Sequence, residues 1–116
     1  MPSNSFKIGV EKMQQTAILK VDGAFVDFHA KNIVNVVNDL LAKDFINFIL
    51  NLNSCTDLNN YGVSVLISMI GSIKQKDGKL FFTHLDVNQE KKLKTMGLSA
   101  YAEFVSDDKS VLDTFQ

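Results

Sequence analysis

The feature that most constrains the fold is residues 46–76, where an apolar run, a polar stretch and an amphipathic segment follow one another. Residues 46–52 (INFILNL) are too short to span a membrane but have the length of a strand that is covered on both faces. After the polar residues 53–62, apolar side chains recur at the spacing of a helix face, at Val63, Leu66, Ile67, Ile70 and Ile73. The sequence therefore predicts a central strand, a polar loop and a helix.

The start of this helix is a candidate binding site on physical grounds alone. A helix N-terminus carries free backbone N–H groups and the positive end of the helix dipole, which favour anionic groups. Asn59 or Asn60 can cap the helix with a side-chain oxygen. Gly62 has no side chain, so we expect it to leave the backbone open to a partner.

The first 45 residues predict a hairpin and a helix. Apolar and polar residues alternate over 6–10 and over 17–21, and we expect Gly23 to end the second strand. Asp27 can then cap a helix that stops near Lys43. The residues that face inward at helical spacing are Ala30, Ile33, Val37, Leu40 and Leu41.

The last 43 residues continue the alternation of strands and helices. We expect Gly78 to adopt the left-handed conformation that ends the preceding helix, followed by a strand over residues 79–83. Asp86 and Gln89 have the spacing of a capping box, which opens a short helix that ends at Met96 and Gly97. A short strand over residues 102–105 and a helix capped by Asp107 or Asp108 complete the chain.

The predicted order is therefore β-β-α-β-α-β-α-β-α. Strands that alternate with helices pair in parallel through crossovers, so the fold class is α/β: a small mixed β-sheet packed with about four α-helices. Residues 1–116 have the length of a single domain, in which we expect residues 1–5 to be flexible. The loop 53–61 lies at a strand C-terminus, where sites gather in such sheets.

Composition excludes several classes of partner. With 12 basic and 13 acidic residues the formal charge is −1, which disfavours nucleic acid and anionic membranes as partners. The first residues lack the pattern of a signal peptide and no apolar run approaches a membrane span, so we expect a cytoplasmic protein without direct membrane insertion. The single cysteine, Cys55, cannot form an internal disulfide.

No catalytic or metal-binding pattern stands out. His29, His84 and Cys55 lack metal-ligand spacing, and no cation neighbours Cys55 in sequence to make its thiol reactive. Asp57 is the only carboxylate of the loop, without the acidic cluster that a phosphoryl-accepting receiver domain would need. We find no nucleophile–base pair and no phosphate-binding glycine loop, and therefore expect no enzyme, no metal and no cofactor.

The sequence resembles a known family in the segments 48–52, 59–66, 79–82 and 93–98. This order of strand, glycine-ended turn, helix, strand and Gly-Leu-ended helix is similar to the STAS family of bacterial anti-sigma-factor antagonists, over nearly the whole chain. The resemblance implies a STAS-like fold and a role in protein binding. It also implies a partner that is a histidine-kinase-like anti-sigma factor.

The resemblance breaks at the regulatory turn. In that family the turn commonly reads Asp-Ser-Ser-Gly, and the partner kinase phosphorylates the second serine. Alignment on Gly62 places Tyr61 at the phosphosite, so the resemblance implies that the serine switch is absent. The residues that it assigns to partner binding are Asp57, Asn59, Asn60, Tyr61, Gly62 and Ser64.

Several interpretations remain open. Tyr61 can be a binding anchor, a tyrosine phosphosite or a surface aromatic, while Ser54, Thr56 and Ser64 are alternative phosphoacceptors. The same fold also suits an accessory subunit of a membrane transporter, and a small nucleotide-binding protein is the alternative from a different class. A homodimer through an exposed edge strand is a further option.

Overall fold

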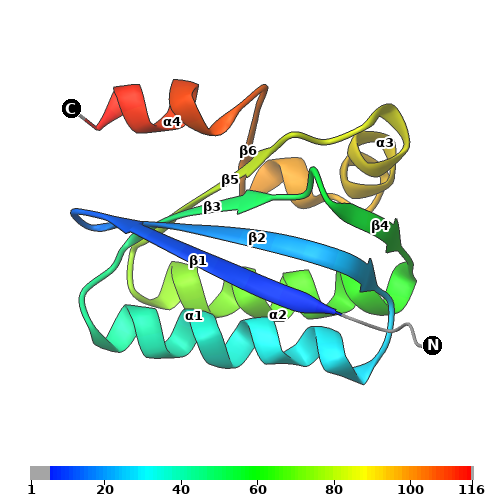
Figure 1. The fold of residues 1–116 in the computed structure, drawn as a ribbon, viewed down its shortest axis with the longest axis horizontal. Coiled ribbons are helices and arrows are strands. Elements are labelled where there is room, and N and C mark those ends of the chain that lie inside the picture. Colours follow the sequence, from blue (N-terminus) through cyan, green and yellow to red (C-terminus); the bar gives the residue numbers. More distant parts are fainter. Residues whose placement is uncertain (1–5, 116) are drawn as a thin grey trace.

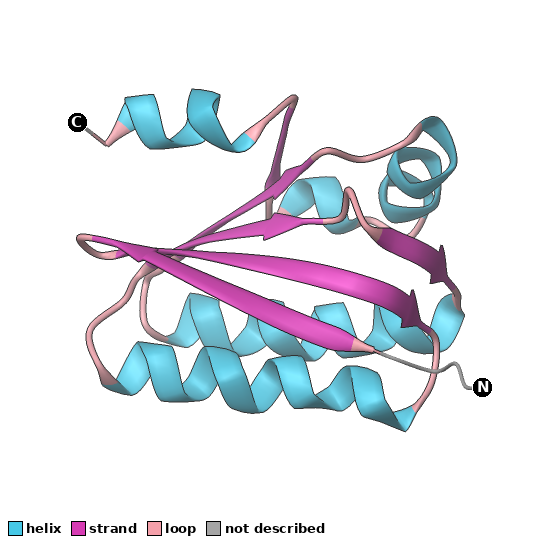
Figure 2. Ribbon diagram, viewed as in Figure 1, coloured by secondary structure: helices cyan, strands magenta, loops and turns pink. Residues whose placement is uncertain are grey.

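The computed structural model describes residues 6–115 and consists of one mixed β-sheet with helices on both faces (Figures 1 and 2). The strands run in the order β1-β2-β3-β5-β6, and β4 pairs with β2 alone. The strands are β1 (Lys7–Met13), β2 (Thr16–Phe25), β3 (Asn47–Asn51), β4 (Cys55–Leu58), β5 (Lys79–Thr83) and β6 (Glu103–Val105). The helices are α1 (Asn32–Ala42), α2 (Asn60–Gln75), α3 (Val87–Thr95) and α4 (Asp108–Thr114), with short 3₁₀ turns at Phe28–Lys31 and Leu98–Ala100.

The predicted fold class is confirmed. Strands β1 and β2 pair antiparallel, and every other pair in the sheet is parallel. The parallel pairs follow from the crossover helices, which return the chain to the same end of the sheet. No helix within residues 6–115 is long and apolar enough to cross a membrane.

The predicted end of β2 at Gly23 is wrong. The strand continues through Gly23 to Phe25, and Gly23 has a φ of 106°, which a glycine adopts without strain. Strand β2 pairs with β3 as far as Lys20 and with β4 from Gly23 onward, and the register against β4 shifts between Gly23 and Ala24. Glycine here absorbs an irregularity within the strand.

The predicted loop over residues 53–62 contains a strand that the sequence did not reveal. Strand β4 pairs in parallel with the last residues of β2, so the observed order is β-β-α-β-β-α-β-α-β-α. Cys55 and Leu58 are buried, whereas Thr56 and Asp57 between them are exposed. This pattern has neither the alternation of a half-buried strand nor the apolar run of a central one.

The main core lies on the face of the sheet that α1 and α2 cover (Figure 1), and Leu93 of α3 also belongs to it. All five residues predicted to face inward from the first helix are buried. Helix α1 ends at Ala42 with Lys43 as its C-cap, as predicted. The strands contribute Leu19, Phe48, Leu50 and Phe82 to this core.

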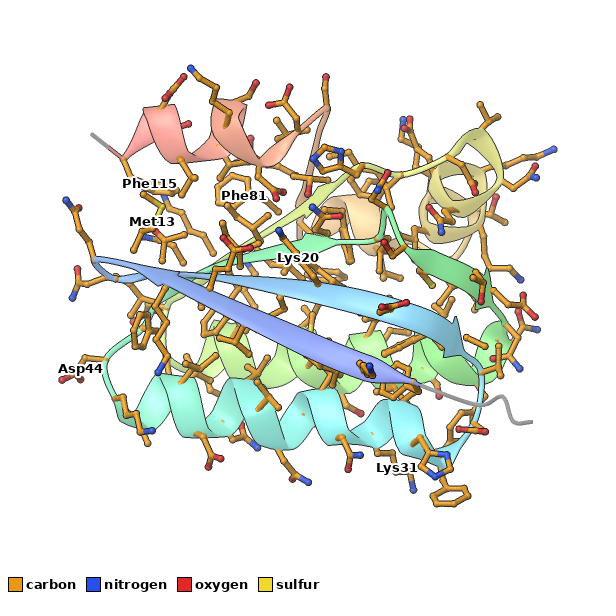
Figure 3. The ribbon with its side chains drawn as sticks, viewed as in Figure 1. Met13, Lys20, Lys31, Asp44, Phe81 and Phe115 are labelled. Carbon is orange, nitrogen blue, oxygen red and sulfur yellow. The ribbon has the colours of Figure 1, made fainter. Side chains whose placement is uncertain are left out.

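Of the helices within residues 6–115, α4 is the one that packs on the opposite face. Ile18, Ile49 and Phe81 form a second apolar cluster with Val111 of α4. The rings of Phe81 and Phe115 meet edge to face with their centroids 5.8 Å apart, and both lie between α4 and the sheet (Figure 3). The main core is therefore packed against several helices, whereas the second cluster is packed against one short helix.

The helix ends confirm two predictions and correct a third. Asp86 and Gln89 form the predicted capping box, and Gly97 has a φ of 87° after α3. At the end of α2, however, the left-handed residue is Asp77 (φ 56°), not Gly78. Gly78 lacks a side chain because a Cβ would lie 2.6 Å from the carbonyl oxygen of Ile46.

Candidate functional site

The candidate site is built on the N-terminus of α2. Asn59 is the N-cap: its side-chain oxygen accepts a hydrogen bond from the backbone N–H of Gly62 at 2.9 Å. The same amide group donates to the carbonyl oxygen of Val26 at 3.1 Å. Asn59 therefore joins the start of α2 to the chain that follows β2, and of the two predicted caps it is the one used.

Three predicted site residues lie on the exposed side of this helix start. Tyr61 is 37% exposed, and the ammonium group of Lys31 lies 6.0 Å from the centroid of its ring. Asn60 accepts a hydrogen bond from Lys92 Nζ at 3.2 Å, and Ser64 donates from its hydroxyl to the Tyr61 carbonyl at 2.6 Å. We call Asn60, Tyr61 and Ser64 together with Lys31 and Lys92 the helix-start surface.

The two lysines of this surface were not found from the sequence. Lys31 ends the 3₁₀ turn before α1, in the lower right of Figure 3, and Lys92 belongs to α3. They reach Tyr61 and Asn60 only because the fold packs three helix ends together. The result is an exposed helix N-terminus at which one lysine lies over the Tyr61 ring and another contacts Asn60.

The expectation that Gly62 keeps the backbone open to a partner is wrong. Gly62 is buried and faces into the molecule. A Cβ at this position would overlap the carbonyl oxygen of Phe25 and lie 2.9 Å from Phe25 Cδ2 and 3.1 Å from Leu58 Cδ1. The absence of a side chain serves the packing of α2 against the end of β2.

Asp57 lies apart from Tyr61, on the exposed face of β4. It lines a polar hollow of about 280 Å³ between β4 and α3, shared with Thr56, Asp86 and Lys92. Because Lys92 also contacts Asn60, this hollow adjoins the helix-start surface. The structure thus brings Asp57 to the margin of the predicted site.

Cys55 is not in an exposed loop. Its side chain is buried, its thiol donates to the carbonyl oxygen of Asp57 at 3.3 Å, and burial raises the thiol pKa. A raised pKa keeps the thiol protonated and unreactive near neutral pH. Residues 6–115 contain no group of three or more His, Cys, Asp and Glu side chains that could hold a metal ion.

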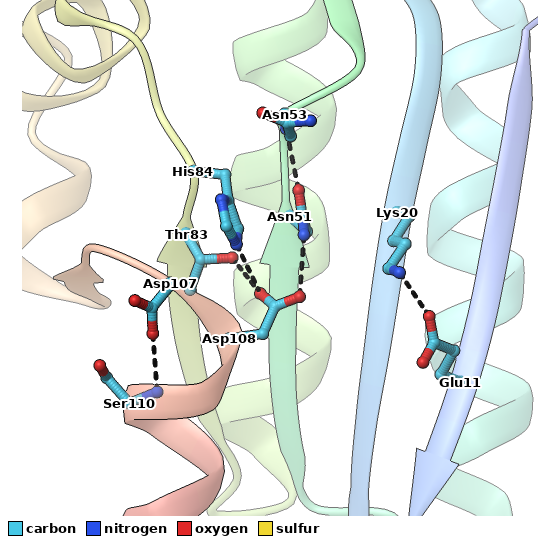
Figure 4. Close-up of polar contacts among 9 residues, drawn as sticks. All are labelled: Glu11, Lys20, Asn51, Asn53, Thr83, His84, Asp107, Asp108 and Ser110. Carbon is cyan, nitrogen blue, oxygen red and sulfur yellow. Dashed lines mark hydrogen bonds and ion pairs between the residues drawn. The ribbon is translucent and has the colours of Figure 1, made fainter.

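A second polar cluster joins α4 to the sheet (Figure 4). Asp108 accepts hydrogen bonds from Asn51 Nδ2 at 2.8 Å and from Thr83 Oγ1 at 2.5 Å, and His84 Nε2 lies 3.9 Å away. Asp107 is the N-cap of α4 and accepts from the Ser110 N–H. The sequence offers Asp107 and Asp108 as alternative caps, and Asp107 is the one used. The cluster around Asp108 could have been predicted only from Asn51 and Thr83, which are polar residues at the C-termini of neighbouring strands.

The family comparison agrees with this architecture. The model of the STAS domain matches residues 7–109 of the chain. No curated protein matches the chain by sequence.

Solved structures with the same fold include an anti-sigma factor antagonist from Mycobacterium paratuberculosis, at 14% identity and a TM-score of 0.80, covering 97% of this chain and 96% of that one. The Bacillus cell fate determinant SpoIIAA in its phosphorylated form is similar at 14% identity, with a TM-score of 0.73 and coverage of 97% and 100%. RsbS from Moorella thermoacetica is 12% identical, with a TM-score of 0.70 and coverage of 93% of both chains. At these identities the likeness establishes the fold.

Proposed function

The chain belongs to the STAS domain family, and from that premise we propose that it is a cytoplasmic protein-interaction module of the anti-sigma-factor-antagonist type. Its partner in this proposal is a histidine-kinase-like anti-sigma factor. The partner docks on the helix-start surface, with Asp57 and Asn59 at its margin. STAS domains of the SpoIIAA-like fold generally act as interaction domains without catalysis.

The observation that carries the proposal is the exposure of Tyr61 at a helix start that Lys31 and Lys92 contact. A tyrosine ring that is partly exposed in the free protein can bury apolar area in a partner pocket, and such aromatic residues often dominate binding energy. Lys31 lies over the ring, Lys92 contacts the neighbouring Asn60, and both would steer a partner surface that carries carboxylates. The N-cap provided by Asn59 holds this arrangement in place before binding.

The same surface lacks the serine switch. Residues 59–61 are Asn, Asn and Tyr, so a serine kinase has no acceptor in the turn. In the proposal the protein is competent to bind without dephosphorylation. Incubation with a serine-specific anti-sigma kinase and ATP should leave the intact mass unchanged; a phosphate mapped to Tyr61 would contradict this, and one on Ser54, Thr56 or Ser64 would move the acceptor elsewhere.

Partner capture from the native cell followed by affinity measurement tests the proposal. A histidine-kinase-like ATPase among the co-purified proteins supports it, whereas a transporter ATPase or permease would replace it with the accessory-subunit function. Micromolar binding of GTP or ATP in calorimetry would instead favour a nucleotide-binding protein.

The test of the surface is Tyr61→Ala measured against the captured partner. We expect at least a tenfold loss of affinity, which corresponds to about 1.4 kcal/mol. Tyr101→Ala is the matched control, because Tyr101 is also exposed, at 58%, and lies after the 3₁₀ turn that follows α3. Equal affinities for wild type and Tyr61→Ala would remove Tyr61 from the site.

A further inference from the structure

Strand β1 lies at one edge of the sheet, and the turn that joins it to β2 shows which of its backbone groups are bonded. The turn between β1 and β2 has two residues, so the closing pair of Met13 and Thr16 must exchange hydrogen bonds. Bonded and unbonded pairs alternate in an antiparallel ladder, so Glu11, Gly9 and Lys7 also bond to β2. The residues between them direct their N–H and C=O groups outward: Ile8, Val10 and Lys12.

No other strand of residues 6–115 pairs with this outer edge. We propose that two copies of the chain associate through it, with their β1 strands antiparallel about a twofold axis, so that the two sheets become one. Such an edge is a template for pairing with another strand. The symmetry and the hydrogen-bonding pattern together leave only a few registers, because outward-facing residues must bond to outward-facing residues.

Charge selects one of these registers. When the axis passes through Gly9, Lys7 of each copy lies opposite Glu11 of the other, twice by symmetry. Axes through Ile8 or Val10 place Lys7 opposite Gly9 or Met13 and form no such ion pair. Opposite charges that face each other across two strands stabilise the pairing. The backbone groups of Lys7 and Glu11 bond to β2 within each copy, so across the dimer these residues form pairs without backbone hydrogen bonds. Such pairs bring the side chains closest.

The surroundings of β1 fit the same register. Glu11 already contacts Lys20 Nζ on β2 at 2.5 Å, with both side chains on the α4 face of the sheet (Figure 4). In the dimer its carboxylate would lie between Lys20 and Lys7 of the second copy. On the other face, Ile8 would lie opposite Val10, which is 39% exposed in the single chain.

Because Lys7 and Glu11 of one β1 strand complement Glu11 and Lys7 of another, the partner that we propose for this edge is a second copy of the chain. Lysines on an edge strand usually oppose pairing, because they must be buried against the incoming strand. Here the lysine at position 7 would be neutralised by a glutamate that the same strand carries four residues later. A strand without this spacing of opposite charges would leave the ammonium group unpaired.

Sedimentation equilibrium of the wild-type chain up to about 1 mM tests the proposal, because small interfaces associate in this range. We expect a reversible monomer–dimer equilibrium, and a chain that stays monomeric would overturn the proposal. Val10→Pro removes one outward N–H, which an edge strand tolerates, and should raise the dimer dissociation constant at least tenfold. Thermal melting verifies that this variant is folded.

A charge exchange tests the register without disturbing the backbone. Lys7→Glu alone and Glu11→Lys alone each create two like-charged pairs and should weaken self-association at least tenfold, whereas a mixture of the two variants restores both opposite-charge pairs and should form a heterodimer. Lys79→Glu, the same charge change at the exposed start of β5, should leave the equilibrium unchanged. Failure of the mixture to associate, or an unaffected Val10→Pro variant, would contradict the proposed pairing.

Discussion

Two glycines of α2 should respond in opposite directions to the same substitution. Gly62 lies in the first turn of the helix and Gly71 in its second half. A methyl group on Gly62 would overlap the Phe25 carbonyl and contact Phe25 Cδ2 at 2.9 Å and Leu58 Cδ1 at 3.1 Å. A methyl group on Gly71 would meet no atom within 4 Å.

The size of each change in the free energy of unfolding depends on whether the atoms near the new methyl group can move away. The Phe25 carbonyl belongs to the last residue of β2, which β4 holds through the pairing of Phe25 with Leu58. Alanine removes about 1 kcal/mol of helix penalty at either position, while overpacking costs about 1–3 kcal/mol and occasionally more. Because the obstacle at Gly62 is backbone, we expect Gly62→Ala to lower the free energy of unfolding by about 2 kcal/mol or more. Gly71→Ala should raise it by about 0.5–1 kcal/mol.

Urea unfolding followed by circular dichroism measures both changes on one scale. For a chain of this size about 1 kcal/mol shifts the melting temperature by about 4 °C, so the two variants should differ by about 10 °C or more. A Gly62→Ala protein as stable as wild type would refute the assignment of Gly62 to packing. It would restore the view that this glycine serves a partner.

Three further predictions concern polar groups elsewhere in the fold. Asp108→Ala should lower the free energy of unfolding by about 2–3 kcal/mol, because Asn51 and Thr83 lose a charged acceptor near the core; a neutral result in urea unfolding would contradict the role of the cluster. Hydrogen bonds from Ser110 lower the pKa of Asp107, so its contribution to stability is present above its ordinary pKa of 3.8 and is lost as the pH falls through the lower folded value. Asp107→Asn keeps the cap but does not titrate, so the free energy of unfolding, measured with urea below about pH 4, should fall less steeply with pH than in the wild type. An unchanged pH dependence would exclude Asp107 as its source. The thiol of Cys55 should react with a disulfide reagent at pH 8 only as fast as the chain unfolds, and a rate equal to that of free cysteine would contradict its burial.

The elements with a clear period were predictable from the sequence. The inward face of α1 follows from apolar residues at helical spacing, and the capping box of α3 from two polar residues three positions apart. Strand β4 was not predictable, because its only buried side chains, Cys55 and Leu58, stand at opposite ends of four residues. The strand conformation of β4 depends on its pairing with β2 and is not indicated by its own sequence.

The glycines show where local rules give way to packing. Gly78 looked like a helix-ending residue, yet Asp77 takes the left-handed conformation and Gly78 is required by the nearby backbone of Ile46. Gly62 looked like an open surface and is instead a contact with β2. In both cases the neighbour that decides is distant in the sequence.

The candidate site was predictable in its position but not in its composition. Asn59 as a cap and Tyr61 as an exposed ring follow from local sequence, since both depend on the start of one helix. Lys31 and Lys92 stand 30 and 32 residues from the residues that they contact, Tyr61 and Asn60, and meet them only in the folded chain. No local pattern marks either lysine among the other cations.

The double hydrogen bond of Asn59 also has a consequence for the rate at which complexes break. Its amide fixes both the first turn of α2 and the chain at Val26, so a partner that binds Tyr61 meets a backbone that is already ordered. Binding then costs little conformational entropy in these two segments, because they are ordered before the partner arrives. In the complex, the same hydrogen bonds oppose local unfolding of the first turn of α2, which would otherwise help the partner to dissociate. We therefore expect Asn59→Ala, which frees both segments, to shorten the lifetime of a complex more than it slows its formation.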